Sequence, residues 1–271
     1  MNARFQSLAV ASQKGGVGKT TVSLNLAFSL VNRGTRVCIV DVDPQGAVAL
    51  SLSRRLSRSA GLSEWLQGRA PLSEVLVPTR LQGLSLLPVG QVSGLRTEGF
   101  GNRLEDGRVL QTLLAELTGY DLVLLDTPSG FGGATLGALR ACDAVLVPVQ
   151  AEPVAARTLA RTFEVINELR RTHGGPELAG VLLTMVQSQD PNSTTIVQDL
   201  VRTVPSQILL ETQIPRDPVF LDASAAGVPL GLLRRRPPPV SLTFDHLAAE
   251  LEPRLGLGGA EADDVPVSLV D

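Results

Sequence analysis

The segment 13–21, with the sequence QKGGVGKTT, restricts the fold of this chain more than any other feature. A short apolar run at residues 8–11 precedes it, and a stretch without glycine or proline follows it to about Asn32. This order predicts a strand, a glycine-rich loop and a helix that is ended by Gly34. The backbone N–H groups of such a loop turn inward, and the helix N-terminus adds the positive end of its dipole. The segment therefore predicts a phosphate-binding loop.

Both lysines of the chain lie in this loop. Against 22 arginines, the sequence has lysine only at positions 14 and 19, which indicates that a compact ammonium is needed at these two places. Lys19 is predicted to bridge the β- and γ-phosphates of a nucleotide, and the hydroxyl of Thr20 to ligate Mg²⁺. The other residues predicted to bind the nucleotide are Lys14, Gly15, Gly16, Val17, Gly18 and Thr21. The alternative is a tight glycine turn without a ligand, which the flanking strand and helix disfavour.

Apolar and helical segments alternate along the chain. We expect strands at residues 36–41, 84–88, 121–126, 144–149, 179–185 and 207–210. Helices are expected at 103–117, 133–141, 154–172 and 193–204, with shorter helical pieces at 62–67 and 72–76 and a loop at 89–102. The alternation predicts an α/β fold with a mostly parallel central sheet and helices on both faces, as in P-loop NTPases.

The end of the chain has a different composition. Apolar residues at Phe244, Leu247, Ala248 and Leu251 predict a helix over residues 241–252 that packs on the body of the protein. Residues 256–271 are acidic, glycine-rich and free of lysine and arginine, so we expect a disordered tail.

Composition excludes several classes of protein. The net charge is −3 and 44% of the residues are hydrophobic, which fits a large globular domain and not a disordered or fibrous chain. Cys38 and Cys142 are too few for a metal or disulfide framework. No 18-residue apolar run and no charged-then-apolar leader occurs, so neither a membrane span nor a secretory signal is indicated. The acidic tail also lacks the basic residues of a lipid-binding helix, and we expect a cytoplasmic protein without a membrane partner.

Several segments together resemble one known family. Residues 14–20, KGGVGKT, are similar to the deviant Walker A motif of the ParA/MinD family of P-loop ATPases. The DVDPQG segment at 41–46 resembles the second motif of that family, and LLDTP at 124–128 resembles its Walker B motif. Three further segments are also similar: VPVQAE at 147–152, GVLLTM at 180–185 and IPR at 214–216. The DPQG and VPVQAE forms favour the ParA (Soj-like) branch, and we expect a single P-loop ATPase domain over residues 1–255.

The resemblance gives roles to three aspartates. Asp126 ends a strand beside the phosphate loop, where it is expected to hold Mg²⁺ through water. Asp43 is expected to orient or deprotonate the attacking water, and Asp41 to support the site from near the loop. The alternative is that these strand-end carboxylates only cap the turns that follow them.

The same resemblance places other side chains at the nucleotide. Lys14 is expected to reach across an ATP-bound sandwich dimer, so that Lys14, Lys19 and Asp43 form the catalytic set. Met185 and Pro215 are expected to contact the nucleotide, although Pro215 is equally compatible with an ordinary turn.

The activity of the family supplies the expected function. ATP closes a homodimer that binds nonspecific, nucleoid DNA, and a ParB-like or other adaptor protein stimulates hydrolysis of ATP to ADP and phosphate. Such a cycle segregates or positions a chromosome, a plasmid or another large cargo. The implied cofactors are ATP and Mg²⁺, and the implied location is the nucleoid.

Arginine clusters are the candidates for DNA contact, because nonspecific binding depends on a local basic surface and not on net charge. Many ParA proteins carry arginine at two places where this chain has Gln189 and Val219, so their DNA surface does not transfer directly. The alternative is that these arginines form ordinary solvated surfaces. The candidates are Arg234, Arg235 and Arg236, together with Arg54, Arg55 and Arg58, and Arg202 and Arg216 as further contributors.

Two other functions remain open at this stage. A biosynthetic P-loop enzyme of the dethiobiotin-synthetase or cobyrinate-amidase type uses ATP to activate a carboxylate, but no separate substrate motif is visible. A regulatory ATPase switch would control a protein partner without binding DNA.

Overall fold

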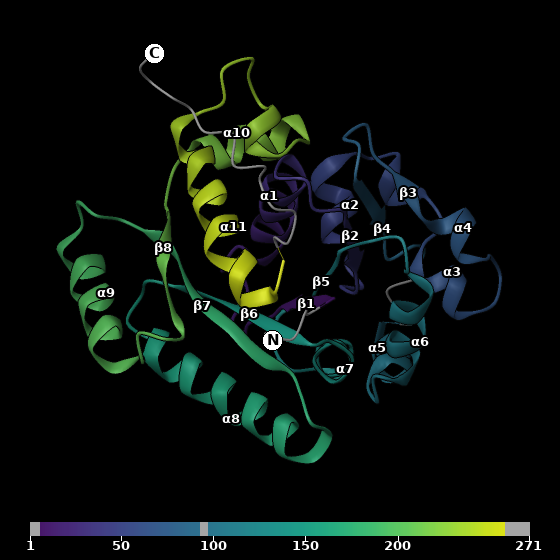
Figure 1. Cartoon of the computed structure of the whole chain (residues 1–271), viewed down its shortest axis with the longest axis horizontal. Coiled ribbons are helices and arrows are strands. Elements are labelled where there is room, and N and C mark those ends of the chain that lie inside the picture. Colours follow the sequence, from purple (N-terminus) through teal and green to yellow (C-terminus); the bar gives the residue numbers. More distant parts are fainter. Residues whose placement is uncertain (1–5, 93–96, 258–271) are drawn as a thin grey trace, which may run out of the picture.

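An eight-stranded sheet forms the centre of the protein (Figure 1). The structure is a computed structural model that describes residues 6–92 and 97–257. The strand order is β3-β4-β2-β5-β1-β6-β7-β8, and every neighbouring pair is parallel except β3 and β4. The strands are β1 Ser7–Val10, β2 Val37–Asp41, β3 Val77–Pro78, β4 Leu84–Leu87, β5 Leu122–Asp126, β6 Ala144–Gln150, β7 Glu177–Val186 and β8 Leu209–Pro215. The predicted mostly parallel sheet is confirmed.

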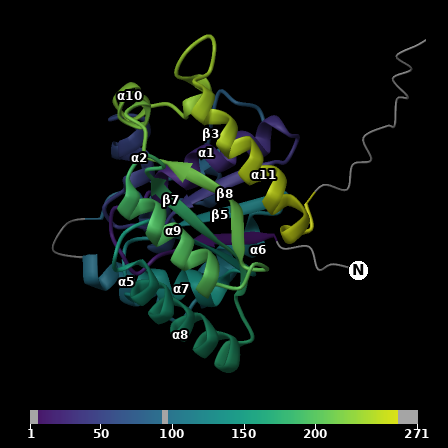
Figure 2. The same cartoon turned by 90° about the vertical axis from the view of Figure 1, so that its left-hand side faces the viewer.

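Helices cover both faces of this sheet, as predicted (Figures 1 and 2). One face carries α1 Lys19–Asn32, α2 Ala47–Leu52, α10 Val219–Ala226 and α11 Leu242–Leu255. The other face carries α3 Leu62–Leu66, α4 Leu72–Val75, α5 Thr97–Leu104, α6 Arg108–Glu116, α7 Gly133–Ala141, α8 Ala155–His173 and α9 Pro191–Thr203. Short 3-10 turns lie at Leu56–Arg58, Leu230–Leu232 and Pro239–Ser241. Within the described ranges no helix is long and apolar enough to cross a bilayer.

The central strands are apolar on both sides because each face of the sheet has its own core. In β1, Leu8 and Val10 belong to the core under α1 and α11, whereas Ala9 packs on the opposite face. All three side chains are fully buried. Strands buried on both faces have continuous apolar sequences, which is why the runs in this chain are so regular.

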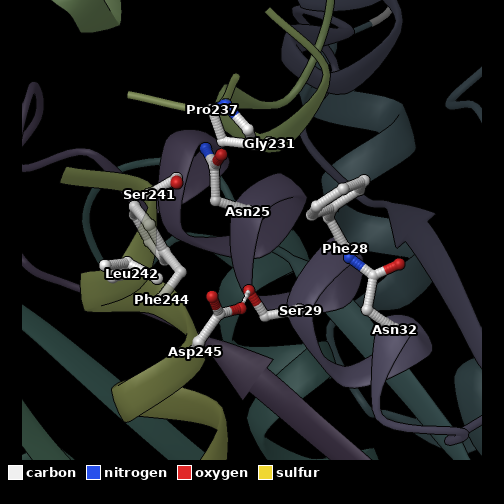
Figure 3. A pocket seen from close by; sticks show the side chains of 10 residues that line it. All are labelled: Asn25, Phe28, Ser29, Asn32, Gly231, Pro237, Ser241, Leu242, Phe244 and Asp245. Atoms are coloured by element: carbon white, nitrogen blue, oxygen red, sulfur yellow. Dashed lines mark hydrogen bonds between the residues drawn. The ribbon is translucent and has the colours of Figure 1, made fainter. Parts of the chain in front are cut away.

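Helix α1 is joined to the C-terminal part of the chain by side-chain hydrogen bonds. Ser29 Oγ donates to Asp245 Oδ1 of α11 at 2.7 Å, beside a pocket of about 180 Å³ (Figure 3). Asn25 Oδ1 accepts from the backbone N–H of Leu230 at 2.8 Å, and Asn25 Nδ2 donates to Thr21 O. These bonds hold the helix that begins at the phosphate loop.

The structure corrects the expected arrangement of residues 89–117. The loop predicted at 89–102 is wrong in its second half, because α5 begins at Thr97. The single helix predicted at 103–117 is also wrong, since Gly107 has a left-handed φ of 79° and separates α5 from α6. Two glycines weaken the helical signal of α5, but its residues Phe100 and Leu104 are buried in the core. Tertiary packing therefore overrides local propensity here.

The other differences are smaller. The sequence does not predict helices α2 and α10 or the two-residue strand β3, and β8 continues to Pro215 and not to residue 210. At the predicted start of the acidic tail, Gly256 ends α11 with a φ of 65° and Leu257 is buried. Residues 258–271, where the rest of the predicted tail falls, lie outside the described residues.

Close contact between α5 and α7 gives a test of the fold. A Cβ at Gly137 would collide with the carbonyl oxygen of Leu104, so Gly137→Ala should lower the free energy of unfolding by about 1–3 kcal/mol. Gly99→Ala in α5 is the matched control. A Cβ at Gly99 would meet no other described part of the protein within 4 Å, so this change should be neutral or slightly stabilising. Urea denaturation followed by circular dichroism measures both. A Gly137→Ala variant as stable as the wild type would contradict this packing.

Candidate nucleotide-binding site

The carboxyl ends of three neighbouring strands meet at the phosphate loop. Asp126, the last residue of β5, is paired with Val10 at the end of β1 and with Asp41 at the end of β2. The loop leaves β1 at this edge and turns into α1 through Gly16 and Gly18, which have φ values of 76° and 88°. Only glycine adopts these angles without strain, so the turn depends on both. The loop and two buried carboxylates therefore share one edge of the sheet.

Two hydroxyls of α1 hold the carboxylate of Asp126. Thr20 Oγ1 donates to Asp126 Oδ2 and Ser23 Oγ donates to Asp126 Oδ1, each at 2.7 Å. Both Asp126 and Ser23 are completely buried. The two oxygens of the carboxylate are therefore fixed in orientation by the hydroxyls of α1.

The same oxygens are suited to a magnesium ion. Mg²⁺ prefers oxygen ligands and usually keeps several waters and phosphate oxygens in its shell. In the described part of the chain, no group of three or more His, Cys, Asp and Glu could hold a metal on its own. Thr20 and Asp126 can supply protein oxygens, directly or through water, while a bound nucleotide completes the shell.

Burial makes the ionised form of these carboxylates costly. Desolvation raises the pKa of Asp126 to about 6, although the hydrogen bonds from Thr20 and Ser23 and the charge of Lys19 oppose the shift. Desolvation also raises the pKa of Asp41 well above its usual range, and the nearby charge of Asp126 adds to this. The carboxylate of Asp41 accepts hydrogen bonds from the backbone N–H groups of Asp43 and Val48, with N···O distances of 3.0 Å in both. Asp41 thus anchors the turn that carries Asp43.

Lys19 points its ammonium toward the segment that follows β5. Its Nζ donates to Ser129 Oγ at 2.9 Å, and the residue is only 7% exposed. Desolvation lowers the pKa of Lys19, while the charges of Asp126 and Asp43 oppose that shift. Two carboxylates therefore lie near enough to favour the charged form of Lys19.

Asp43 is half-buried at the start of the turn after β2. Its Oδ1 accepts the backbone N–H of Gln45 at 2.8 Å. One carboxylate oxygen is thus used to shape the turn, as the capping alternative predicts, while Oδ2 has no hydrogen bond among the described residues. The geometry is compatible with a second role for the free oxygen.

Lys14 is not free in the single chain. Its Nζ forms an ion pair with Glu152 Oε1 at 2.5 Å and donates to Gln150 Oε1 at 3.2 Å. Both partners lie at the end of β6, in the segment VPVQAE that sequence analysis singled out without giving these residues a role. A lysine that acts in a second subunit must first leave these partners.

A pocket of about 490 Å³ opens beside the loop. Its floor is tied to the loop, because Thr184 Oγ1 donates to Val17 O at 3.0 Å. Met185 has a positive φ of 54°, which is unusual for a side chain of this type, and lines the pocket together with Pro215. The remaining wall is largely apolar and includes Val17, Thr21, Val22, Ile214, Phe220 and Leu221. These surfaces can accept a planar base.

Both arginine clusters lie in segments that contact α10 or the glycine that ends it. Arg234, which precedes the 3-10 turn at Pro239–Ser241, pairs with Asp222 of α10 at 3.4 Å. At the other end of α10, Gly227 packs against the carbonyl oxygen of Leu52, just before Arg54. The side chains of Arg54, Arg55, Arg58, Arg234, Arg235 and Arg236 are all exposed. Folding therefore brings two segments that are far apart in sequence, each with an arginine cluster, into contact with the α10 region.

The other candidate positions differ among themselves. Val219 is buried as the first residue of α10, whereas Gln189 is exposed. Arg216 is exposed at the rim of the base pocket, and Arg202 lies on α9, 3.9 Å from Asp199. Arg202 and Arg216 thus lie on other elements than the two clusters.

Sequence analysis missed two hydroxyl groups of the site. Ser23 lies three residues after Thr20, a spacing that places both hydroxyls on one face of a helix, and this signal could have identified it. Ser129 follows the LLDTP segment directly, but only the fold brings it to Lys19.

Comparison with known sequences identifies the family. A family model described as "AAA domain" matches residues 5–178. The chromosome partitioning protein ParA of Caulobacter vibrioides is 34% identical over 229 residues, which cover 82% of this chain and 85% of that protein. The chain belongs to the ParA family of ATPases.

Solved structures share the fold of this ParA-family chain. A complex of a Cyanothece McdA variant with ATP has a TM-score of 0.76 at 22% identity and covers 95% of this chain and 98% of that chain. A cobyrinic acid a,c-diamide synthase from Mycobacterium smegmatis, solved with an ATP analogue and magnesium, has a TM-score of 0.67 at 31% identity. That match covers 82% of this chain and 91% of the synthase. The same architecture thus holds adenine nucleotides in both proteins.

Because the pKa of Asp126 is raised, the free energy of unfolding of this ParA-family chain without nucleotide should depend on pH. Between an ordinary pKa of 3.8 and the folded value of about 6, rising pH removes stability, and the cost is complete above pH 6. Asp126→Asn should therefore raise the melting temperature at pH 7.5 in EDTA, by about 5–10 °C for roughly 3 kcal/mol. The gain should largely vanish near pH 4, where the buried Asp126 of the folded wild type is protonated and therefore neutral, as asparagine is.

Thermal unfolding followed by circular dichroism across this pH range measures the effect. The exposed carboxylate of Asp199 on α9 supplies the control, since Asp199→Asn should show no such pH-dependent gain. An Asp126→Asn variant that is less stable than the wild type at pH 7.5 would contradict the burial argument.

Proposed function

We propose that this chain is an ATP-dependent switch that dimerises on ATP, binds nonspecific DNA and hydrolyses ATP to release it. The observation that carries the proposal is the arrangement of Lys19 and Thr20 at the start of α1, facing Asp126 across one edge of the sheet. Asp43 approaches from the adjacent strand, and an apolar pocket adjoins the loop. Together these groups offer sites for the phosphates, the metal, the attacking water and the base.

In the proposed reaction, each side chain acts at a particular part of ATP. The loop amides and the N-terminus of α1 bind the phosphates, and Lys19 neutralises the charge that develops between the β- and γ-phosphates. Mg²⁺, held by Thr20 and by Asp126 through water, would neutralise phosphate charge in the transition state. Asp43 orients the water that attacks the γ-phosphorus, using the carboxylate oxygen that the turn leaves free.

Dimerisation is proposed to change the partners of Lys14. In the single chain its charge is neutralised by Glu152 and solvated by Gln150. The phosphates of a nucleotide in a second subunit carry more negative charge than one carboxylate, so they can replace Glu152 as the partner. Lys14 would then add positive charge to a site that already contains Lys19.

DNA binding is proposed to use the two arginine clusters near α10. Nonspecific binding needs cations that phosphates can reach, and the clusters after α2 and before α11 provide exposed guanidinium groups in two segments that contact the α10 region. A bound DNA would place the protein on the nucleoid. A ParB-like or other adaptor that stimulates hydrolysis completes the proposed cycle, which would segregate or position a chromosome, plasmid or other large cargo.

A biosynthetic role is the second candidate. The match to the synthase of Mycobacterium smegmatis is the observation that favours it. Such an enzyme would consume ATP only when its carboxylate substrate is present, and DNA would have no effect. The third possibility is a regulatory switch that does not bind DNA. Its ATP turnover would change neither with DNA nor with a small carboxylic acid.

The water-orienting role of Asp43 predicts a trapped dimer. Asp43→Ala should bind ATP and Mg²⁺ but hydrolyse ATP at least about 100-fold more slowly, so the dimer should persist. Size-exclusion chromatography with light scattering, run with ATP, measures the dimer, and phosphate release measures hydrolysis. Lys19→Ala is the comparison variant, because it should not bind the nucleotide and should remain monomeric. Finding only monomer for Asp43→Ala with ATP would remove the support for this role.

The arginine surface predicts a salt-dependent loss of DNA binding. Changing Arg234, Arg235 and Arg236 together to Ala should weaken retention on DNA of any sequence, because phosphate contacts carry no base information. The slope of log K against log salt should fall by up to about 3. Arg157→Ala/Arg161→Ala, which removes two exposed arginines on α8 across the sheet, should leave retention unchanged.

Fluorescence anisotropy at several salt concentrations, together with ATPase rates with and without plasmid DNA, gives both readouts. Unchanged retention in the Arg234–Arg236 variant would contradict the assignment of that cluster. ATP turnover that requires a small carboxylic acid and ignores DNA would instead support the synthase.

A further inference from the structure

Ser129 is placed at the phosphate loop by the backbone around it. It lies in the segment that leaves β5 three residues after Asp126. On one side, Thr127 Oγ1 donates to Val10 O at 2.9 Å, and on the other, the N–H of Gly130 donates to Ser12 O at 3.1 Å. Both bonds attach the segment to the strand that leads into the loop. The position of Ser129 is therefore fixed relative to the loop.

The hydroxyl of Ser129 lies directly against the loop and its lysine. A Cβ on Gly15 would come within 3.2 Å of Ser129 Oγ, so only the absence of a side chain at Gly15 leaves this space. Ser129 Oγ accepts a hydrogen bond from Lys19 Nζ at 2.9 Å. The ammonium that is proposed to bind phosphate is thus already bound to this oxygen in the single chain.

The remaining hydrogen of the Ser129 hydroxyl has no acceptor among the described residues. Ser129 is exposed, so a ligand in the loop can reach this hydroxyl. A hydroxyl can accept one hydrogen bond and donate another at the same time. A phosphate oxygen bound to Lys19 would lie next to this hydrogen and would be a strong, charged acceptor.

The place of Ser129 in the fold indicates which phosphate its hydroxyl would contact. The loop amides and the N-terminus of α1 surround the phosphate that lies deepest in the loop. Ser129 instead comes from the segment after β5. Its hydroxyl contacts Lys19 Nζ and lies next to Gly15, which is at the start of the loop, four residues before α1. The terminal phosphate is therefore the one within its reach.

We propose that the Ser129 hydroxyl donates a hydrogen bond to the γ-phosphate of ATP and so makes the site distinguish ATP from ADP. The inference rests on the proposed function, because it needs a nucleotide in the phosphate loop. It adds a side chain that reports the presence of the third phosphate, a property that Lys19 does not provide because Lys19 also serves the β-phosphate.

The test compares two nucleotides in three variants. Isothermal titration calorimetry with Mg²⁺ measures the affinity for a non-hydrolysable ATP analogue and for ADP. Ser129→Ala should weaken binding of the ATP analogue by about 10-fold, the usual effect of losing a hydrogen bond to a charged group, and leave ADP within about 2-fold. Ser129→Thr keeps the hydroxyl and should bind both nucleotides as the wild type does. Ser188→Ala, at an exposed serine after β7, is the matched control and should change neither affinity.

The possible results separate the inference from the proposed function. Equal weakening for both nucleotides in Ser129→Ala would show that the serine acts only through Lys19, and would overturn the inference. An unchanged affinity for the ATP analogue would overturn it as well. A wild-type protein that binds neither nucleotide would contradict the proposed function itself. Because Ser129 is exposed, the Ala variant is expected to fold normally, and its melting temperature checks this.

Discussion

The carboxylate of Asp126 is completely buried at the end of the central strand β5, and much of the site is arranged to satisfy it. An isolated buried carboxylate is too costly to remain charged, so it needs donors and a nearby cation. Thr20 and Ser23 provide the donors at 2.7 Å, and Lys19 provides the charge. All three belong to α1. The register of this helix against β5 is therefore set by a polar contact as well as by the apolar core.

This requirement extends to the segments on both sides of α1. The helix can begin at Lys19 only because Gly16 and Gly18 allow the backbone to turn sharply after β1. Its other end is held by Ser29, which bonds to Asp245 of α11 (Figure 3). Residues near the end of the chain thus contribute to the position of a loop near its beginning. Substitutions in α11 can change the phosphate loop without touching it.

Most of the architecture could be predicted from sequence, because its signals are local. The strands that are buried on both faces give uninterrupted apolar runs, and α7 occupies the predicted residues 133–141. The break between α5 and α6 could not be predicted, since it lies at Gly107, where a Cβ would come within 2.8 Å of Arg140 Cβ on α7. The same limit applies to the site. The loop and its acidic neighbours are visible as motifs, but the contacts of Lys19 with Ser129 and of Lys14 with Glu152 join residues more than 100 positions apart.

The contact of Lys14 with Glu152 also gives a physical reason for the unusual use of lysine in this chain. A guanidinium at position 14 could bind the carboxylate of Glu152 through two parallel hydrogen bonds, and such a bidentate pair is harder to separate. An ammonium forms a single-point contact, and it can exchange a carboxylate for a phosphate without losing a matched geometry. Position 19 has a related requirement, because its ammonium interacts with the charges of Asp126 and Asp43 while the residue is almost fully buried. A chain that otherwise uses arginine for its cations therefore keeps lysine where a compact charge must change partners or fit a confined space.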